Sequence, residues 1–196
     1  MARSRGFSVV ELMVAVAILG IALAASMPLI VDWTRNMAIR NAAESLKGGI
    51  EKTRQAALRR NADMSFWLVA DTTSKILTSS CVRSDTGPSW VIAKLDPEGQ
   101  CDAAPSETSA PRIVEKWSAA DGANDVSLVT ADEGGAAGNL LTFNSLGQVS
   151  AANQIAQIDI THAKGGDIRP LRLLISRAGA VRLCDPAVAA GDTRAC

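Results

Sequence analysis

The chain has 196 residues, of which 47% are hydrophobic, and its 20 basic side chains equal its 20 acidic ones. This length and composition predict one folded domain with at most an appendage and exclude a chain that is disordered throughout. The zero formal charge excludes a general attraction to nucleic acid, and a single histidine argues against His-based zinc sites and a Ser-His-Asp triad.

The first predicted element is a helix that begins with a charge-free apolar segment. Leu12–Val31 has no charged side chain, with Arg3 and Arg5 before it and Asp32 after it. About 20 apolar residues span a bilayer as a helix, and the positive-inside rule places the basic leader in the cytoplasm. The pattern predicts a membrane-spanning helix over residues 7–31, which Pro28 is expected to bend.

Glu11 separates this helix from more ordinary apolar segments. A secretory signal cleaved near Ala22-Leu23-Ala24 and a simple membrane anchor are the alternatives, and neither has a use for an acid at the start of the apolar run. Inserting a carboxylate into a bilayer is costly. Glu11 therefore predicts a partner cation, since a buried carboxylate is tolerated when an ammonium group pairs with it.

The residues around this acid, Arg5-Gly6-Phe7-Ser8-Val9-Val10-Glu11-Leu12, resemble the class III leader of type IV prepilins and pseudopilins. The resemblance implies that prepilin peptidase removes residues 1–6 by cutting after Gly6, and that Phe7, the new N-terminal residue, is N-methylated. It also implies that Glu11 neutralises the N-terminal ammonium of a neighbouring subunit in a filament. Removal of the leader leaves 18 of the 20 basic side chains against 20 acidic ones, so the mature chain is slightly acidic.

The helical pattern continues beyond the apolar segment. Between residues 32 and 61 the apolar residues recur at steps of three and four, which predicts an amphipathic helix with one face on a core. Gly48-Gly49 is expected to weaken it locally. Together the two segments predict a rod about 80 Å long, whose first half must lie in a membrane or among other subunits.

After Asn61 the helical period stops, and short apolar runs alternate with Gly, Pro, Ser, Asp and Asn. This pattern predicts a periplasmic antiparallel β domain over residues 62–196. The expected strands are 65–70, 75–78, 90–95, 112–117, 126–130, 140–144, 148–150, 157–162, 171–176 and 181–184, with hairpin turns at 144–147 and 177–179. The expected fold class is α+β: a long N-terminal helix whose second half packs on an antiparallel β-sheet.

Two later segments carry a second resemblance. Residues 141–147, Leu-Thr-Phe-Asn-Ser-Leu-Gly, are similar to the Phe-x-x-x-Gly hairpin of GspH/FimT-type pseudopilins, and residues 174–186 are similar to the C-terminal segment of FimT/FimU-like members. With the leader, these segments resemble the GspH/FimT family of pilin-like minor pilins and pseudopilins at both ends of the chain. Residues 65–135 carry no such resemblance.

The resemblance implies a minor pilin of a type IV pilus that primes or supports assembly. Such a subunit waits in the inner membrane, crosses it once with a cytoplasmic N-terminus and a periplasmic domain, and then joins the filament. Its implied partners are prepilin peptidase, other major and minor pilins and the inner-membrane assembly platform. We expect no enzymatic activity, cofactor or metal, because no nucleophile–base pair or phosphate-binding loop stands out; His162 is expected to be half-buried or on the surface.

Four cysteines, Cys81, Cys101, Cys184 and Cys196, lie on the side predicted to be outside the cytoplasm. Two disulfides are expected in that oxidising compartment, and four cysteines allow three pairings. Cys81–Cys101 and Cys184–Cys196 are favoured because each closes a short loop. The absence of any Cys-x-x-Cys pair argues against a metal site.

Two alternative functions remain open on the sequence. A type II secretion pseudopilin of the GspH kind would carry the same leader. DNA uptake in transformation is associated with a Gly-Arg-x-Arg pattern in some FimT-like pilins, but Gly179-Ala180-Val181-Arg182 has Ala180 at the first Arg position. Arginines suit phosphate contacts; the candidate DNA contacts are Arg172, Arg177, Arg182 and Arg194.

Overall fold

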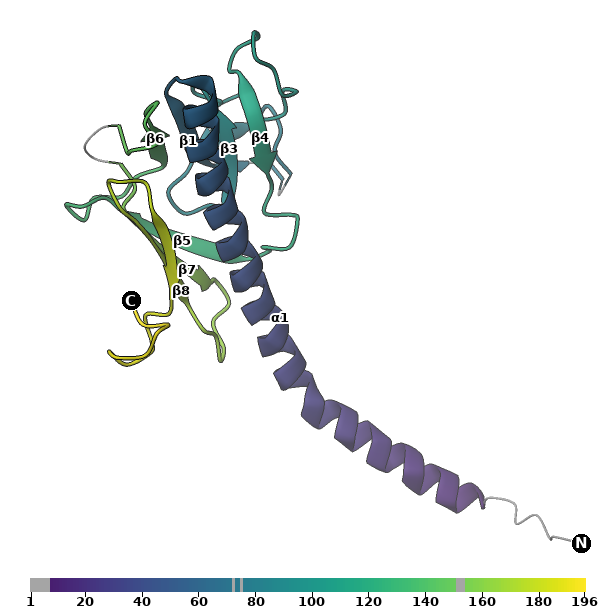
Figure 1. The fold of residues 1–196 in the computed structure, drawn as a ribbon. Helices are drawn as coiled ribbons and strands as arrows, with labels where there is room; N and C mark the ends of the chain where they lie inside the picture. Colours follow the sequence, from purple (N-terminus) through teal and green to yellow (C-terminus); the bar gives the residue numbers. More distant parts are fainter. Residues whose placement is uncertain (1–7, 72, 75, 151–153) are drawn as a thin grey trace, which may run out of the picture.

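A computed structural model describes residues 8–196 except 72, 75 and 151–153. Gly6 and Phe7, with the predicted cleavage and methylation sites, lie outside the described residues. Within them, one long helix, α1 (Val9–Arg60), is followed by nine short strands that form two sheets. Figure 1 shows α1 running past both sheets, with its first half clear of them.

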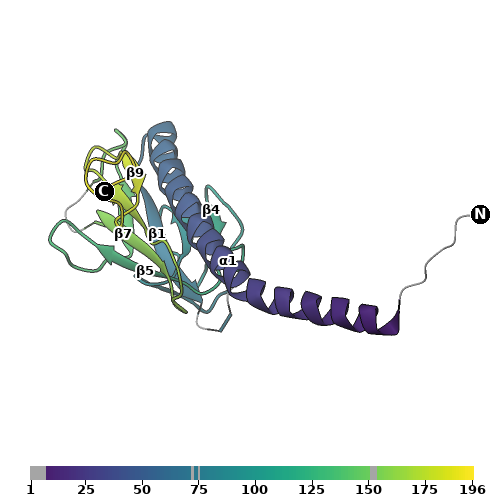
Figure 2. The same cartoon turned by 90° about the horizontal axis from the view of Figure 1, so that it is seen from below.

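Helix α1 joins the predicted segments 7–31 and 32–61 into one element of 52 residues. Figure 2 shows that its axis changes direction between the projecting half and the half on the sheets. The helix ends at Asn61, which has the left-handed φ of 47°. There the Asn61 and Ala62 amides donate to the carbonyls of Leu58 and Ala57, which satisfies two carbonyls of the last turn.

The strands form two antiparallel sheets. In the first, the order is β2 (Cys81–Arg83), β1 (Met64–Asp71), β3 (Ser89–Ala93) and β4 (Ile113–Trp117), while β6 (Leu140–Phe143) also pairs with β1. Strands β6 and β2 share one edge of β1, opposite residues 64–67 and 69–71. The second sheet has the order β5 (Val126–Ala131), β7 (Gln157–His162), β8 (Leu171–Ile175) and β9 (Val181–Cys184).

The main core lies between the second half of α1 and both sheets. Ile39, Leu46 and Ile50 of the helix are fully buried there, together with Phe66 of β1 and Ile158 of β7. On β7, buried and half-buried residues alternate, as the sequence pattern requires of a strand with one face on a core. The α+β fold predicted from the sequence is therefore confirmed.

A second apolar cluster covers the opposite face of β1 and β3. Trp67, Val91 and Ile113 belong to it, together with the disulfide between Cys81 and Cys101. Strand β3 is consequently buried at every position. Burial on both faces explains why the sequence around β3 is a continuous apolar run rather than an alternating one.

The structure differs from the predicted strands in three places. Residues 76–78 form no strand, because the Asp71 carboxylate accepts hydrogen bonds from Thr73, Ser74 and Thr78 and holds this segment as a loop. Around Val149, a single bridge to Phe143 replaces the predicted strand 148–150. Strand β2 was not predicted, and the single predicted sheet is two sheets.

Candidate functional site: the apolar half of helix α1 and its junction with the β domain

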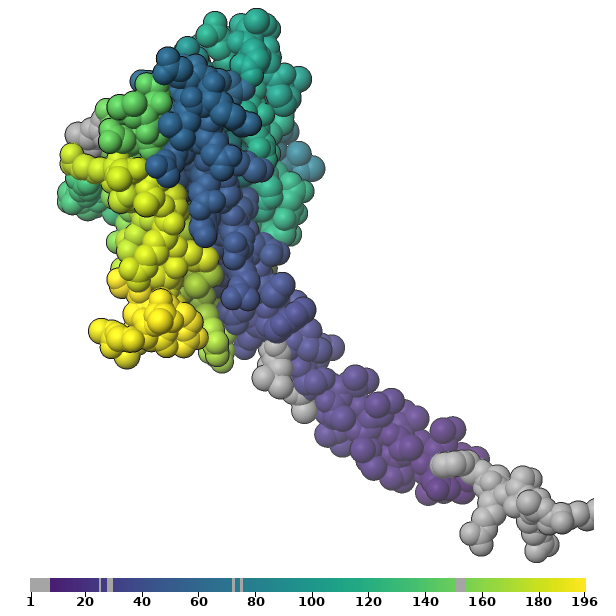
Figure 3. Space-filling model, in the orientation of Figure 1, coloured from purple at the N-terminus to yellow at the C-terminus, as the bar shows by residue number. Residues whose placement is uncertain are grey.

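The first half of α1 exposes apolar side chains on all of its sides. Between Val9 and Val31, thirteen large apolar side chains are 41–74% exposed. Figure 3 shows this part of the helix projecting from the domain. A helix that is apolar all round needs a cover of lipid or protein. Within the described ranges, no helix meets the length and hydropathy required of a membrane-spanning segment.

Glu11 lies in the first turn of α1, and its residue is exposed among these apolar side chains. Ser8 precedes the helix as its N-cap but makes no side-chain capping bond. Residues 8–31 contain no Lys, Arg or His. A partner cation for Glu11 would therefore have to come from outside residues 8–31.

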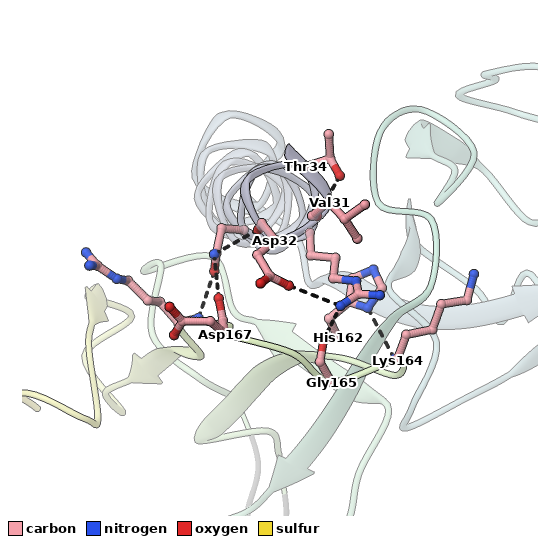
Figure 4. A network of polar contacts seen from close by, with 10 residues as sticks. Val31, Asp32, Thr34, His162, Lys164, Gly165 and Asp167 are labelled. Carbon is pink, nitrogen blue, oxygen red and sulfur yellow. Dashed lines mark hydrogen bonds and ion pairs between the residues drawn. The ribbon is translucent and has the colours of Figure 1, made fainter. Parts of the chain in front are cut away.

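Figure 4 shows Val31, Asp32 and Thr34 of the helix close to His162 and Gly165 of the β domain. Arg35 makes a direct hydrogen bond between the two parts. Its Nη1 atom donates to Oδ1 of Asp32, at 3.1 Å, and to the carbonyl oxygen of Gly165, also at 3.1 Å. Gly165 belongs to the loop of residues 163–170, which joins β7 to β8. Arg35 thus ties the helix to a loop that lies 130 residues away in the sequence.

Asn36 makes a second connection to the same loop. Its amide nitrogen donates to the carbonyl oxygens of Asp32, at 2.9 Å, and Asp167, at 3.0 Å. Its amide oxygen accepts from the backbone N–H of Arg169 at 2.7 Å. Because both connections use backbone atoms of the loop, they fix the loop against α1 where the helix leaves the domain.

A surface pocket of about 370 Å³ lies beside this junction. Its wall is formed by Val31, Thr34, Arg35, Ala38, Gly122, Asn124, Asp125, His162 and Lys164. His162 is only 8% exposed, and its Nδ1 accepts a hydrogen bond from the Lys164 backbone N–H. Burial lowers the pKa of His162, with a further decrease from the charges of Arg35 and Lys164 that Asp125 opposes.

The two hairpin turns meet at the other end of the domain. Nε of Arg54 donates to the carbonyl oxygen of Gly147 at 2.9 Å. A Cβ atom on Gly179 would lie 2.2 Å from that same oxygen. Only glycine at position 179, which also has a positive φ of 79°, allows this approach. The turns predicted from Gly147 and Gly179 therefore pack on each other and on α1.

The structure joins Cys81 to Cys101 and Cys184 to Cys196, the pairing that the short loops favour. The first disulfide ties the start of β2 to the loop before β4 and lies in the second apolar cluster. The second ties the C-terminus to the end of β9. There, a backbone bridge between Asp185 and Ala195 also holds the tail.

The four candidate DNA contacts each have a partner within the chain. Arg172 makes two hydrogen bonds to Asp159, at 2.5 and 3.0 Å. Arg194 does the same with Asp192, at 3.1 and 2.8 Å. Arg177 pairs with Glu133, which raises the pKa of the arginine, and Arg182 donates to the carbonyl of Ala195. Three of the four arginines are therefore paired with a carboxylate, and Arg182 has an uncharged partner.

The sequence analysis did not identify Arg35 and Asn36 as residues that hold the domain to the helix. Their partners are the backbone atoms of a loop, and such atoms leave no signature in the side-chain pattern. His162 was expected to be half-buried or on the surface, but it is buried, because the end of β7 is covered by α1 and the neighbouring loops. Nothing in its strand pattern indicated a pocket. The sequence pointed to a functional surface through the leader motif, the apolar run and Glu11.

Comparisons with known proteins agree with this arrangement. Residues 1–27 match the family model of the prokaryotic N-terminal methylation motif, and residues 42–179 match that of the type II transport protein GspH. The chain belongs to the GspH family. The GspH match covers most of the domain-packed half of α1 and all strands from β1 to β8.

Other comparisons find more distant similarity to this GspH-family chain. No curated protein sequence matches it. A crystal structure of the type IV minor pilin FimU of Pseudomonas aeruginosa in space group P65 is 16% identical, with a TM-score of 0.46 over 78% of this chain and 98% of FimU. A second FimU structure, in space group P21, is 17% identical, with a TM-score of 0.47 over 79% of this chain and 93% of that one.

Proposed function

We propose that this GspH-family chain is a minor pilin of a type IV pilus that primes or supports filament assembly. Its role would be structural, not enzymatic, and it would need no cofactor. The observation that carries the proposal is the exposure of apolar side chains all round α1 between Val9 and Val31. Only a bilayer or other helices provide an apolar cover on every side of such a rod.

In this proposal the apolar half holds the chain in the inner membrane, with the N-terminus in the cytoplasm and the β domain in the periplasm. Prepilin peptidase removes residues 1–6 by cutting after Gly6, and Phe7 is then N-methylated. The match of residues 1–27 to the N-terminal methylation motif supports this processing. The chain would leave the bilayer when the assembly platform transfers α1 to the filament, where other pilins provide its cover.

Glu11 would set the position that the incoming subunit takes relative to its neighbour in the filament. Its carboxylate lies in the first turn of α1, and the ammonium of Phe7 in a neighbouring subunit would be its partner. An unpaired carboxylate in an apolar filament core is strongly destabilising, so a subunit would be accepted only where the two charges meet.

Glu11→Ala tests this pairing. We expect incorporation into filaments to fall by about tenfold or more, because the neighbouring ammonium loses its partner. The measurement is the amount of the subunit in sheared filaments relative to that in the membrane. Glu44→Ala, which removes an exposed acid from the domain-packed half of α1, is the matched control and should leave incorporation unchanged. Normal incorporation of Glu11→Ala would contradict the pairing.

A pseudopilin of type II secretion is the second candidate function. The match of residues 42–179 to the GspH family, which is described as a type II transport protein, favours it. Both functions use the same processing and the same apolar helix. A strain that lacks the chain distinguishes them, because either surface piliation or protein secretion should fail. Loss of surface pili with normal secretion would support the pilus, and the reverse would support the secretion system.

A further inference from the structure

Trp33 is an exposed aromatic residue at the end of the apolar half of α1. It is 64% exposed, whereas the other three tryptophans of the chain are buried or half-buried in the β domain. It follows directly after the charge-free run that ends at Val31 and the first charged residue, Asp32. Trp33 therefore lies at the boundary between the apolar and polar parts of the helix.

The side of α1 that carries Trp33 points away from the β domain. Ile30, Trp33, Met37 and Arg40 recur at steps of three and four residues, so they share one side of the helix. All four are exposed, with Ile30 at 57% and Met37 at 39%. Along this side, apolar and aromatic residues are followed by a cation, which is the order expected where a bilayer gives way to water.

The charged residues nearest to Trp33 are turned toward the β domain instead. The Asp32 carboxylate pairs with Arg35, which also donates to the carbonyl oxygen of Gly165. Asn36 contacts the same loop. The outward side of the helix therefore stays apolar for more than one turn beyond the point where the domain-facing side becomes polar.

The distance along α1 from Glu11 to Trp33 matches the thickness of a bilayer. This part of the helix is about 33 Å long at 1.5 Å per residue. The hydrocarbon core of a bilayer is about 30 Å thick, and a moderate tilt of the helix accommodates the small excess. With the indole at the periplasmic interface, the Glu11 carboxylate would lie at the cytoplasmic interface, where water can solvate it.

We propose that Trp33 is the interfacial anchor that sets the depth of α1 in the bilayer, with its indole at the periplasmic lipid–water interface. The ring would pack against the upper parts of the acyl chains, and its N–H would donate to a lipid carbonyl or to water, so the site selects no headgroup charge. The inference rests on the proposed function, because that function places the apolar half of α1 in the inner membrane. It explains how Glu11 is tolerated before assembly, since Trp33 holds it at the opposite membrane surface.

Quenching of tryptophan fluorescence by brominated lipids tests the position of Trp33. The full chain is reconstituted in phosphatidylcholine vesicles whose acyl chains carry bromine either near the headgroup or near the bilayer centre. We expect stronger quenching by the bromines near the headgroup, and loss of that quenching in Trp33→Phe. Trp117→Phe, which removes a half-buried tryptophan of the β domain, is the matched control and should retain the quenching.

Other quenching results would overturn this position. Stronger quenching by the deep bromines would place the indole in the bilayer core. Absence of quenching would show that another helix or water, not lipid, covers the indole. Quenching that persists in Trp33→Phe would come from a different tryptophan.

Exchange of two side chains on the outward side tests whether the indole sets the depth. Ile30→Trp/Trp33→Ile keeps the composition of the helix but moves the indole about 4.5 Å toward the N-terminus. If the indole is the anchor, the helix shifts toward the periplasm and its first turn enters the bilayer. A bimane label on Val10→Cys should then be quenched more strongly by the brominated lipids than the same label beside an unchanged Trp33. Equal quenching of the two labels would overturn the anchor.

Failure of the proposed function would give different results. If alkaline carbonate extracts the chain from the vesicles, the bilayer location is wrong and this inference fails with it. If the chain resists extraction but still begins at Met1 in cells, the filament proposal alone is contradicted, and the quenching results are unchanged.

Discussion

His162 is a buried histidine whose ionisation the fold opposes. Its ring lies beside Arg35 and Lys164, and the Lys164 backbone N–H donates to its Nδ1. Protonation would break that hydrogen bond and place a third positive charge beside Arg35 and Lys164, which Asp125 offsets in part. The folded state therefore binds a proton at this ring less readily than the unfolded state does.

This difference predicts how stability depends on pH. Because the pKa of His162 is lowered in the folded state, the unfolding free energy should be constant above about pH 6.5 and fall as the pH decreases below it. Urea unfolding of the full chain in detergent at pH 7.5 and pH 5.5 measures the effect. His162→Gln, which cannot titrate, should lose the decrease in this range. A decrease of equal size in the variant would assign it to other groups.

The roles of some single residues could be predicted from the sequence, and those of others could not. Glu11 was conspicuous because an acid beside a charge-free run has few structural explanations. The short disulfide loops favoured the pairing that the structure has. The role of Asn36 could not be predicted. It depends on a hydrogen bond to the backbone of a loop 131 residues away, and the sequence around Asn36 does not indicate that loop.

At the scale of elements, the two adjacent glycines of α1 have opposite roles. The sequence analysis treated Gly48 and Gly49 together as a weak point of the helix. A Cβ atom on Gly49 would lie 2.8 Å from Phe66 and 2.9 Å from Trp90, whereas one on Gly48 would meet nothing within 4 Å. Gly49 therefore allows α1 to approach β1 and β3, while Gly48 has no such role.

The two glycines form a matched pair of substitutions. Gly48→Ala should raise the unfolding free energy by up to about 1 kcal/mol, because alanine has the higher helix propensity. Gly49→Ala should lower it by about 1–3 kcal/mol, because the methyl group overpacks the contact with Phe66 and Trp90. Urea unfolding midpoints of the two variants measure both effects. Changes of the same sign would contradict this account of the packing.

Strands could be predicted where the alternation of apolar and polar residues, or a turn glycine, sets their bounds. The bounds of β7 and β9 follow from alternation and from Gly179, and the structure reproduces both. Strand β2 has three residues, and only Cys81 among them is buried, so its sequence carried no apolar pattern. The split into two sheets depends on pairings such as β1 with β6, between segments far apart in the chain, and short-range patterns do not encode these.

At the scale of the whole molecule, the charge distribution does not favour DNA binding. The mature chain would be slightly acidic, and each candidate arginine in the C-terminal region has an acidic or carbonyl partner. Nucleic-acid affinity depends on uncompensated cations that displace counterions from phosphates.

A mobility-shift titration of the full chain in detergent tests this reading. We expect no shift of duplex DNA at moderate salt, and any weak shift at low salt should be unchanged in the Arg177→Ala/Arg182→Ala double variant. Arg59→Ala is the control for loss of an exposed arginine elsewhere. Tight binding that weakens steeply with salt and disappears in the double variant would instead favour DNA uptake.

The central claim is that the processed chain begins with a methylated Phe7, whose ammonium pairs with Glu11 of a neighbouring subunit. The most direct measurement is the N-terminal sequence and intact mass of the chain recovered from inner membranes and from filaments. The account predicts a chain that starts at Phe7 and carries one added methyl group. A recovered chain that still starts at Met1 would contradict it.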